Sequence, residues 1–133
     1  MTPDRATQQL RKVPFFQFLD FTITGLDETH AVATMPFAER LVGNPVMEYY
    51  HGGIIASFME SVAAICVSHG PDLQPPKPIN LTVDYLRPAV KGPLMTEATV
   101  SRKGKRMASV RTTCWQDDTS RPVAEGVYHF LMV

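Results

Sequence analysis

One stretch of the sequence constrains the fold more than any other. Residues 49–70 read YYHGGIIASFMESVAAICVSHG, and apolar side chains over 54–67 recur around nearly the whole circumference of a helix. A helix that is apolar on almost every side has to be buried. Gly52-Gly53 is a permissive start, and Gly70-Pro71 is a strong stop because proline cannot continue a helix. This pattern predicts a helix of about four and a half turns that the rest of the chain encloses.

A narrow polar stripe interrupts the apolar surface of this helix. Ser57, Glu60, Ser61, Ala64 and Ser68 recur at spacings of three and four residues, so they share one helical face. One carboxylate lies at the centre of that face. Because a buried glutamate without a partner is rare, Glu60 either takes part in chemistry or forms an ordinary hydrogen bond to Ser57 or a backbone amide.

The segments on either side of the helix read mainly as strands. After the helix, side chains alternate with a period of two, which predicts four strands in an antiparallel meander. Their ranges are 79–86, 94–103, 106–117 and 122–133. Before the helix, 18–25 and 30–37 predict a hairpin that turns at 25–28, and an irregular loop follows over 38–50.

These elements predict an α+β fold in which an antiparallel sheet wraps around one long central helix. A single helix cannot cover both faces of such a sheet, so the other face is expected to meet solvent or a partner. With 133 residues the chain is expected to form one domain, 1–133. Residues 1–13 form an N-terminal extension, with a short helix expected over 4–12 that stops near Pro14.

Composition excludes several function classes. Lys plus Arg equals Asp plus Glu at 13 each, which argues against bulk electrostatic binding of nucleic acid or an anionic membrane. No stretch approaches the roughly 18 apolar residues of a membrane span, and the N-terminus lacks a signal-peptide pattern. Cys66 and Cys114 are not part of a CxxC pair. We therefore expect a reduced, cytoplasmic protein.

Two motifs carry a resemblance to a known family. His51-Gly52-Gly53 opens the helix and Glu60 follows nine residues after His51, while TVDYLRPA occupies 82–89. Together with the order of elements, these motifs resemble the hotdog-fold acyl-CoA thioesterases, above all the phenylacetic-acid-degradation type. The resemblance covers roughly residue 14 to the end. It implies a hotdog fold, a homodimer or homotetramer, hydrolysis of an acyl-CoA to free acid and coenzyme A, and no metal or redox cofactor.

The resemblance also implies roles for the residues at the helix start. Backbone N–H groups there lack helical partners and carry partial positive charge. The Gly52 N–H is expected to polarise the thioester carbonyl, and the Gly53 N–H to assist. Glu60 is expected to act across a dimer interface, either as general base or as a nucleophile that forms an anhydride. Asn44 resembles the polar residue that holds the water or the carbonyl, although a turn asparagine explains it equally well.

The remaining substrate contacts are assigned on weaker patterns. His51 is expected to support the helix start, and Ser57 lies beside it on the substrate side. A basic cluster is either a grip on the phosphates of coenzyme A or a solvated hairpin tip. Its members are Arg102, Lys103, Gly104, Lys105 and Arg106, with Arg87 as a further candidate. Val46, Met47, Tyr49, Tyr50, Phe58 and Met59 are either acyl-pocket or core residues.

Several alternatives complete the sequence-based picture. No serine sits in a nucleophile-elbow sequence, and His30, His69 and His129 show no metal-ligand spacing. Cys66 is read as core packing. Pro78 stands where the family often has serine or threonine, with Asn80 and Thr82 nearby. The competing functions are a hotdog-fold acyl-thioester hydratase or dehydratase and a non-enzymatic acyl-CoA-binding protein.

Overall fold

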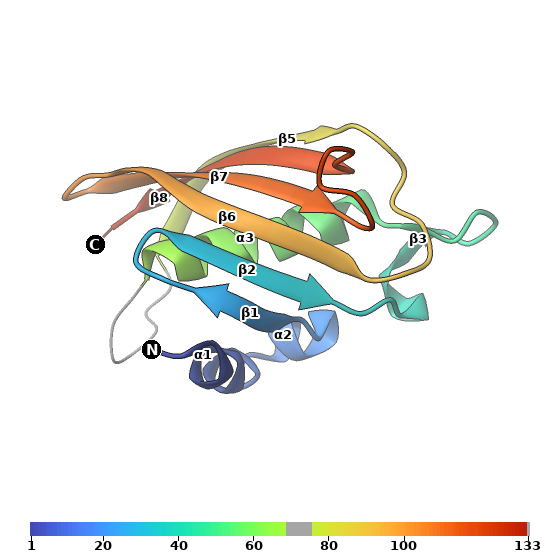
Figure 1. Ribbon diagram of the computed structural model, residues 1–133, viewed down its shortest axis with the longest axis horizontal. Helices are drawn as coiled ribbons and strands as arrows, with labels where there is room; N and C mark the ends of the chain where they lie inside the picture. Colours follow the sequence, from blue (N-terminus) through green and yellow to red (C-terminus); the bar gives the residue numbers. More distant parts are fainter. Residues whose placement is uncertain (69–75, 133) are drawn as a thin grey trace.

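The central helix and the sheet around it organise the molecule. The computed structural model describes residues 1–68 and 76–132. Helix α3 (Gly52–Val67) begins at the expected glycine pair and lies against one face of a curved six-stranded sheet, as Figure 1 shows. The helix ends at Val67, so the predicted stop at Gly70-Pro71 lies outside the described residues, as does His69. No helix in the described ranges is long and apolar enough to cross a membrane.

The sheet is antiparallel, and its strand order is β1-β2-β6-β7-β8-β5. The first hairpin joins β1 (Thr22–Leu26) and β2 (His30–Met35). The later strands are β5 (Lys77–Tyr85), β6 (Leu94–Lys103), β7 (Met107–Trp115) and β8 (Ala124–Leu131). The four predicted strands are therefore present.

The prediction of a simple meander was wrong for β5. This strand pairs with β8 and forms an edge of the sheet, whereas β6, β7 and β8 pair in succession. The connection after β5 is held in place by backbone contacts, since Leu86 and Arg87 donate to the Val123 carbonyl and Ala89 accepts from Tyr50 N. The chain thus crosses from one edge of the sheet to its middle before β6 begins.

The region before β1 differs from the predicted strand. Residues 14–19 form helix α2 (Pro14–Leu19), because Pro14 at the first helical turn starts a helix and does not end one. Asp20 adopts a left-handed conformation with φ of 63°, which ends α2. Helix α1 (Pro3–Leu10) confirms the short N-terminal helix, and it packs beside β1 through the bond from Ile23 N to Thr7 Oγ1 at 3.0 Å.

The segment before α3 is more ordered than the predicted loop. It contains a 3-10 turn, η1 (Glu39–Leu41), and a small hairpin of β3 (Val42–Asn44) and β4 (Tyr49–Tyr50). This hairpin projects beyond the end of the sheet in Figure 1. The His51 N–H donates to the Leu41 carbonyl at 2.9 Å, so η1 fixes the point at which α3 begins.

The core lies between α3 and the face of the sheet that it covers. Phe58, Met59 and Val62 on α3 are fully buried. The sheet contributes large buried side chains, among them Tyr128 and Phe130 on β8, and small ones at Ala31, Ala33, Ala98, Ala108, Ala124 and Gly126. A Cβ on Gly126 would lie 2.8 Å from Thr112 Oγ1 and 3.2 Å from Met59 Cε. Helix and sheet therefore approach closely at Gly126.

Candidate active site

The start of α3 presents one backbone donor without an acceptor. His51 caps the helix, since its Nδ1 accepts from the Gly53 N–H at 2.9 Å. The His51 carbonyl accepts from the N–H groups of Ile54 and Ile55 at 3.0 and 3.2 Å. Among the described residues, nothing accepts a hydrogen bond from the Gly52 N–H. The geometry therefore leaves Gly52 as the free donor and engages Gly53, which was expected to assist.

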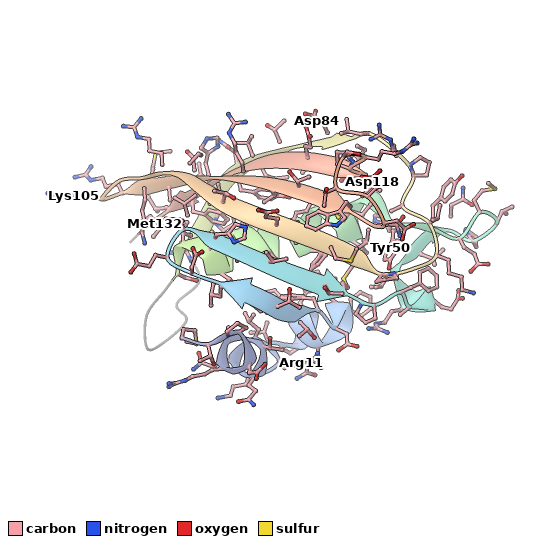
Figure 2. All side chains as sticks on the ribbon, viewed as in Figure 1. Arg11, Tyr50, Asp84, Lys105, Asp118 and Met132 are labelled. Atoms are coloured by element: carbon pink, nitrogen blue, oxygen red, sulfur yellow. The ribbon has the colours of Figure 1, made fainter. Side chains whose placement is uncertain are left out.

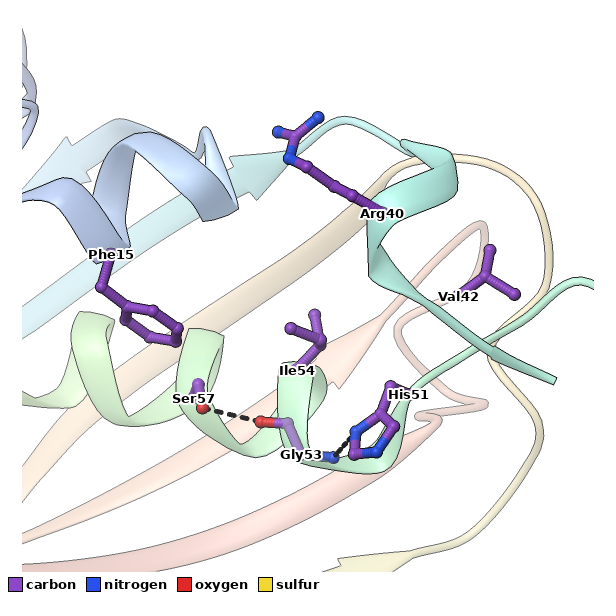
Figure 3. A pocket seen from close by; sticks show the side chains of 7 residues that line it. All are labelled: Phe15, Arg40, Val42, His51, Gly53, Ile54 and Ser57. Carbon is purple, nitrogen blue, oxygen red and sulfur yellow. Dashed lines mark hydrogen bonds between the residues drawn. The ribbon is translucent and has the colours of Figure 1, made fainter. Parts of the chain in front are cut away.

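Two hollows flank this donor. The larger one, of about 430 Å³, lies between α2, η1 and α3, and Figure 3 shows the side chains that line it. These are Phe15, Arg40, Val42, His51, Gly53, Ile54 and Ser57. The smaller one, of about 340 Å³, lies between the helix start and the end of β5, with Tyr49, Gly52, Tyr85, Arg87 and Pro88 among its lining residues.

The larger hollow has an aromatic wall and a basic rim. Phe15 and Phe18 on α2 stack with their ring centroids 6.2 Å apart, and both are exposed. The Arg40 guanidinium lies over the Phe18 ring, and its Nε donates to the Phe18 carbonyl at 2.6 Å. An apolar group that extends from the helix start would therefore meet the Phe15 ring and the aliphatic stem of Arg40.

Glu60 lies on the part of α3 that the sheet leaves uncovered. Its side chain is half-buried, and burial raises the pKa of its carboxyl above the ordinary value. No described residue forms a hydrogen bond with it. The alternative bond to Ser57 does not form, because Ser57 Oγ donates to the Gly53 carbonyl at 2.7 Å. The carboxylate is thus partly desolvated and uncommitted, which suits a general base or a nucleophile.

Glu60 and Gly52 of one chain are too far apart to act on the same atom. Eight residues of helix separate them, which corresponds to about 12 Å along the axis. A reacting carbonyl has to lie within about 3 Å of both the donor and the attacking group. A single chain therefore contains both groups but does not bring them together.

Asn44 is the last residue of β3, at the start of the turn of the β3–β4 hairpin. Its Oδ1 accepts from the N–H groups of Val46 and Met47, both at 3.1 Å, so its carbonyl side organises a turn. The side chain is exposed. The Asn44 oxygen therefore stabilises a turn, as the turn interpretation predicts. Only its amide nitrogen remains available to a ligand.

The basic cluster 102–106 does not lie near the helix start. It forms the exposed tip of the β6–β7 hairpin, and in Figure 2 Lys105 lies at one end of the molecule whereas Tyr50 lies in the other half. The ten residues of β6 span about 33 Å. Arg87, by contrast, lines the smaller hollow, and its Nη1 donates to the Pro122 carbonyl at 2.7 Å.

Two further groups of sequence-based candidates lie elsewhere. Phe58 and Met59 are fully buried in the core, whereas Val46 and Met47 are exposed on the β3–β4 hairpin. Asn80 and Thr82 pair with His129 and Val127 on the outer face of the sheet, away from α3. They cannot replace the polar contact that Pro78 lacks.

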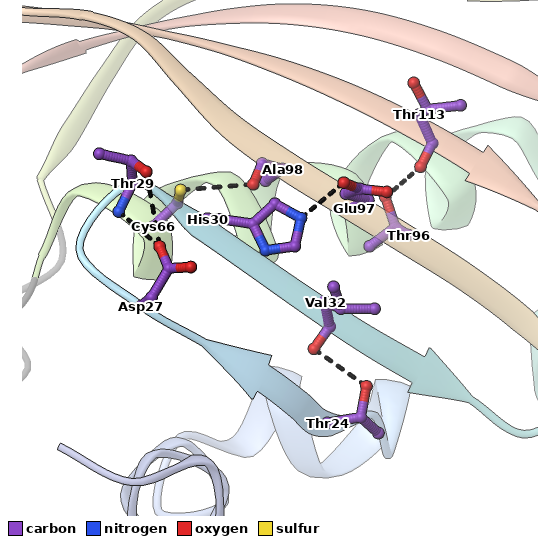
Figure 4. A network of polar contacts seen from close by, with 10 residues as sticks. All are labelled: Thr24, Asp27, Thr29, His30, Val32, Cys66, Thr96, Glu97, Ala98 and Thr113. Carbon is purple, nitrogen blue, oxygen red and sulfur yellow. Dashed lines mark hydrogen bonds and ion pairs between the residues drawn. The ribbon is translucent and has the colours of Figure 1, made fainter.

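The cysteines are part of the core. Cys66 is fully buried, its thiol donates to the Ala98 carbonyl at 3.5 Å (Figure 4), and burial raises its pKa to about 11. Burial raises the pKa of Cys114 to about 12. At neutral pH neither is a thiolate nucleophile. Among the described residues, no three His, Cys, Asp or Glu side chains gather closely enough to hold a metal ion.

Sequence reasoning missed Phe15, Arg40 and Tyr85, which line the two hollows. Phe15 lay between the helix expected over 4–12 and the strand expected over 18–25, so it was assigned to no element. Arg40 lay in a segment read as irregular, and Tyr85 was read only as a strand residue. The only sequence signal for Phe15 was Pro14, which favours a helix start and places the following aromatic residues on a helix.

Comparisons with known proteins identify relatives of this chain. The family model of the acyl-CoA thioesterase N-terminal domain matches residues 44–131. A protein of Saccharolobus solfataricus named as a candidate esterase is 28% identical over 110 residues, which cover 81% of this chain and 77% of that protein.

Solved structures of the thioesterase superfamily share the fold. One member is 26% identical with a TM-score of 0.88, and the match covers 98% of both chains. Zebrafish thioesterase superfamily member 2 has a TM-score of 0.86 at 16% identity, over 100% of this chain and 99% of the other. A candidate thioesterase from Ralstonia eutropha, related to phenylacetic acid degradation, has a TM-score of 0.81 at 24% identity, over 96% of each chain. The expected hotdog fold is confirmed.

The raised pKa of Glu60 predicts how this residue affects stability. Because folding favours the protonated carboxyl, the stability that this group contributes is present at low pH and is lost as pH rises through the folded-state pKa. Glu60→Gln, which cannot ionise, is therefore expected to have a higher Tm than wild type at pH 7. That advantage should shrink near pH 4.

Thermal unfolding between pH 4 and pH 8 measures this difference. Glu125→Gln removes an exposed glutamate on β8 and controls for the loss of one negative charge. A Glu60→Gln variant that is less stable than wild type at pH 7 would show that the carboxylate has a stabilising partner.

Proposed function

Since the chain belongs to the acyl-CoA thioesterase N-terminal domain family, we propose that it hydrolyses an acyl-CoA thioester to a carboxylic acid and coenzyme A. The observation that carries this proposal is the free Gly52 N–H at the start of α3, between two hollows. A thioester carbonyl placed there gains negative charge as it is attacked. The free N–H and the partial positive charge of the helix start stabilise that oxyanion.

Glu60 supplies the attack in one of two ways. As general base it removes a proton from water while the water oxygen bonds to the carbonyl carbon, and the tetrahedral intermediate then expels the thiolate of coenzyme A, which takes up the proton from Glu60. As nucleophile it bonds to the carbonyl carbon and expels the same thiolate, and water hydrolyses the anhydride. Both routes consume one water and yield the acid and the thiol. Both need an ionised Glu60, so activity should fall as pH drops through its raised pKa.

The distance along α3 supports a homodimer, alone or within a tetramer. Because about 12 Å of helix separates Gly52 from Glu60, the Glu60 of a second copy completes each site. The edge strand β5 leaves Leu81 and Tyr85 exposed on the side that faces the helix, and Ile79 is exposed as well. Such an apolar edge favours cover by another chain, and a two-fold symmetric pair would form two identical sites.

The two hollows suggest how the substrate lies. The larger one, with its aromatic wall, is the proposed acyl site. The smaller one, with Tyr49, Tyr85 and Arg87, is the proposed path of the arm that leads to the phosphates. Because the cluster 102–106 lies at the far end of β6, it cannot contact a substrate bound at the helix start of its own chain. It can contact only the phosphates of a substrate bound to another subunit.

Removal of the Gly52 N–H tests the proposed chemistry. Gly52→Pro deletes this donor, and proline suits the first helical position after a residue such as His51 with φ of −64° and ψ of 132°. We expect kcat on the best acyl-CoA to fall about 100- to 1,000-fold. Gly52→Ala adds a Cβ but keeps the N–H, so it controls for the approach of 3.3 Å to the Tyr85 ring.

A panel of acyl-CoAs with thiol detection measures this effect, beside an assay of enoyl-CoA hydration. Release of thiol by wild type and loss of release in Gly52→Pro and Glu60→Ala support a thioesterase. Hydration without thiol release would identify a hydratase, and binding without turnover would identify an acyl-CoA-binding protein.

The acyl site makes a separate prediction. Phe15→Ala removes the ring that lines the larger hollow, so kcat/KM for aromatic and medium-chain acyl-CoAs should fall about tenfold while acetyl-CoA changes little. Val13→Ala is the control, because Val13 is similarly exposed beside α2 but neither lines the hollow nor stacks on Phe15. Equal losses in the two variants, or equal losses for all acyl groups, would place the acyl chain elsewhere.

A further inference from the structure

Tyr85 makes a contact that the proposed mechanism does not use. It lies at the end of β5, and its hydroxyl donates to the Gly52 carbonyl at 2.8 Å. Its ring covers Gly52 closely, since a Cβ on Gly52 would lie 3.3 Å from Cζ and 3.4 Å from the hydroxyl oxygen. A strand far along the sequence therefore holds the residue that carries the free N–H.

The helix start needs such support because it contains two glycines. Glycine has more backbone freedom than any other residue, so a Gly-Gly pair at the first turn of a helix is poorly fixed by local sequence alone. A donor stabilises an oxyanion strongly only when it is already aimed at the position of that oxyanion. The two glycines allow a substrate to approach closely. They are therefore also the residues whose N–H direction is least fixed by the local sequence.

The Gly52–Gly53 peptide is held at both ends. Tyr85 Oη bonds to its carbonyl oxygen at 2.8 Å, and His51 Nδ1 accepts from its N–H at 2.9 Å. Because a peptide unit is planar, bonds at both ends fix its orientation. The adjoining Gly52 N–H then has little freedom left, since the His51 carbonyl of its own peptide accepts two further N–H groups.

We propose that Tyr85 is a positioning residue that, together with His51, clamps the Gly52–Gly53 peptide and so aims the Gly52 N–H at the thioester carbonyl. This inference rests on the proposed function, because it assigns Tyr85 a part in that reaction. Tyr85 acts through the peptide and does not itself touch the reacting atoms.

Tyr128 provides a matched comparison within the same chain. Its hydroxyl donates to the Ala56 carbonyl at 2.9 Å, one helical turn beyond Gly52, and its side chain is fully buried. The chemistry of the two bonds is the same. Only the bond from Tyr85 reaches the peptide beside the free N–H. A comparison of the two residues therefore distinguishes general stabilisation of the helix from orientation of the Gly52 N–H.

Tyr85→Phe and Tyr128→Phe test the proposal by steady-state kinetics and thermal unfolding. For Tyr85→Phe we expect kcat to fall about tenfold with KM within about twofold, because the donor is misaimed but the hollows remain. For Tyr128→Phe we expect a lower Tm and a kcat within about twofold of wild type. A Tyr85→Phe enzyme with wild-type kcat, or equal losses of kcat in both variants, would overturn the role of Tyr85.

Amide hydrogen exchange gives a readout that does not depend on activity. The Gly53 N–H, which is bonded to His51, should exchange faster in Tyr85→Phe than in wild type and should be unchanged in Tyr128→Phe. If wild type releases no thiol from any acyl-CoA, the proposed function fails. Amide hydrogen exchange at Gly53 still shows whether Tyr85 and His51 fix the Gly52–Gly53 peptide. Unchanged Gly53 exchange in Tyr85→Phe would refute the clamp.

Discussion

The packing of an almost wholly apolar helix against one face of the sheet determines where the candidate site lies. Phe58 and Met59 on α3 are fully buried, and Tyr128 and Phe130 on β8 add large buried side chains from the sheet. Helix and sheet approach closely at Gly126, where a Cβ would lie 3.2 Å from Met59 Cε. At the helix start, β5 and η1 each add one hydrogen bond, because Tyr85 Oη donates to the Gly52 carbonyl and the His51 N–H donates to the Leu41 carbonyl.

This enclosure also explains the half-buried acid. The sheet leaves uncovered the narrow stripe of α3 that contains Ser57 and Glu60, and Ser57 and Ser61 satisfy their hydroxyls within the helix. Among the described residues Glu60 has no hydrogen-bond partner, and its burial costs stability at neutral pH. Such a cost is kept at functional sites more often than elsewhere, and the proposed mechanism places Glu60 in the active site of a second copy.

The sequence predicted the elements whose signals are local. The glycine pair and the apolar run marked α3, and period-two alternation marked β6, β7 and β8. The strand expected over 18–25 begins too early, because α2 continues to Leu19 and ends at the left-handed Asp20. The partner of β5 could not be predicted, since strand pairing depends on the whole sheet. Phe15 and Tyr85 reach the helix start from segments that are distant in the sequence. The separation of residues 102–106 from the helix start follows from the length and direction of β6.

The central claim is that each active site combines Gly52 of one subunit with Glu60 of another, and subunit mixing tests it most directly. Gly52→Pro and Glu60→Gln are each expected to be inactive as homodimers. A purified heterodimer of the two, obtained by co-expression with different tags, contains one site with both residues intact. It should recover about half of the wild-type kcat per dimer, because two-fold symmetry gives two equivalent sites. A heterodimer as inactive as both parents, although stably assembled, would contradict the account.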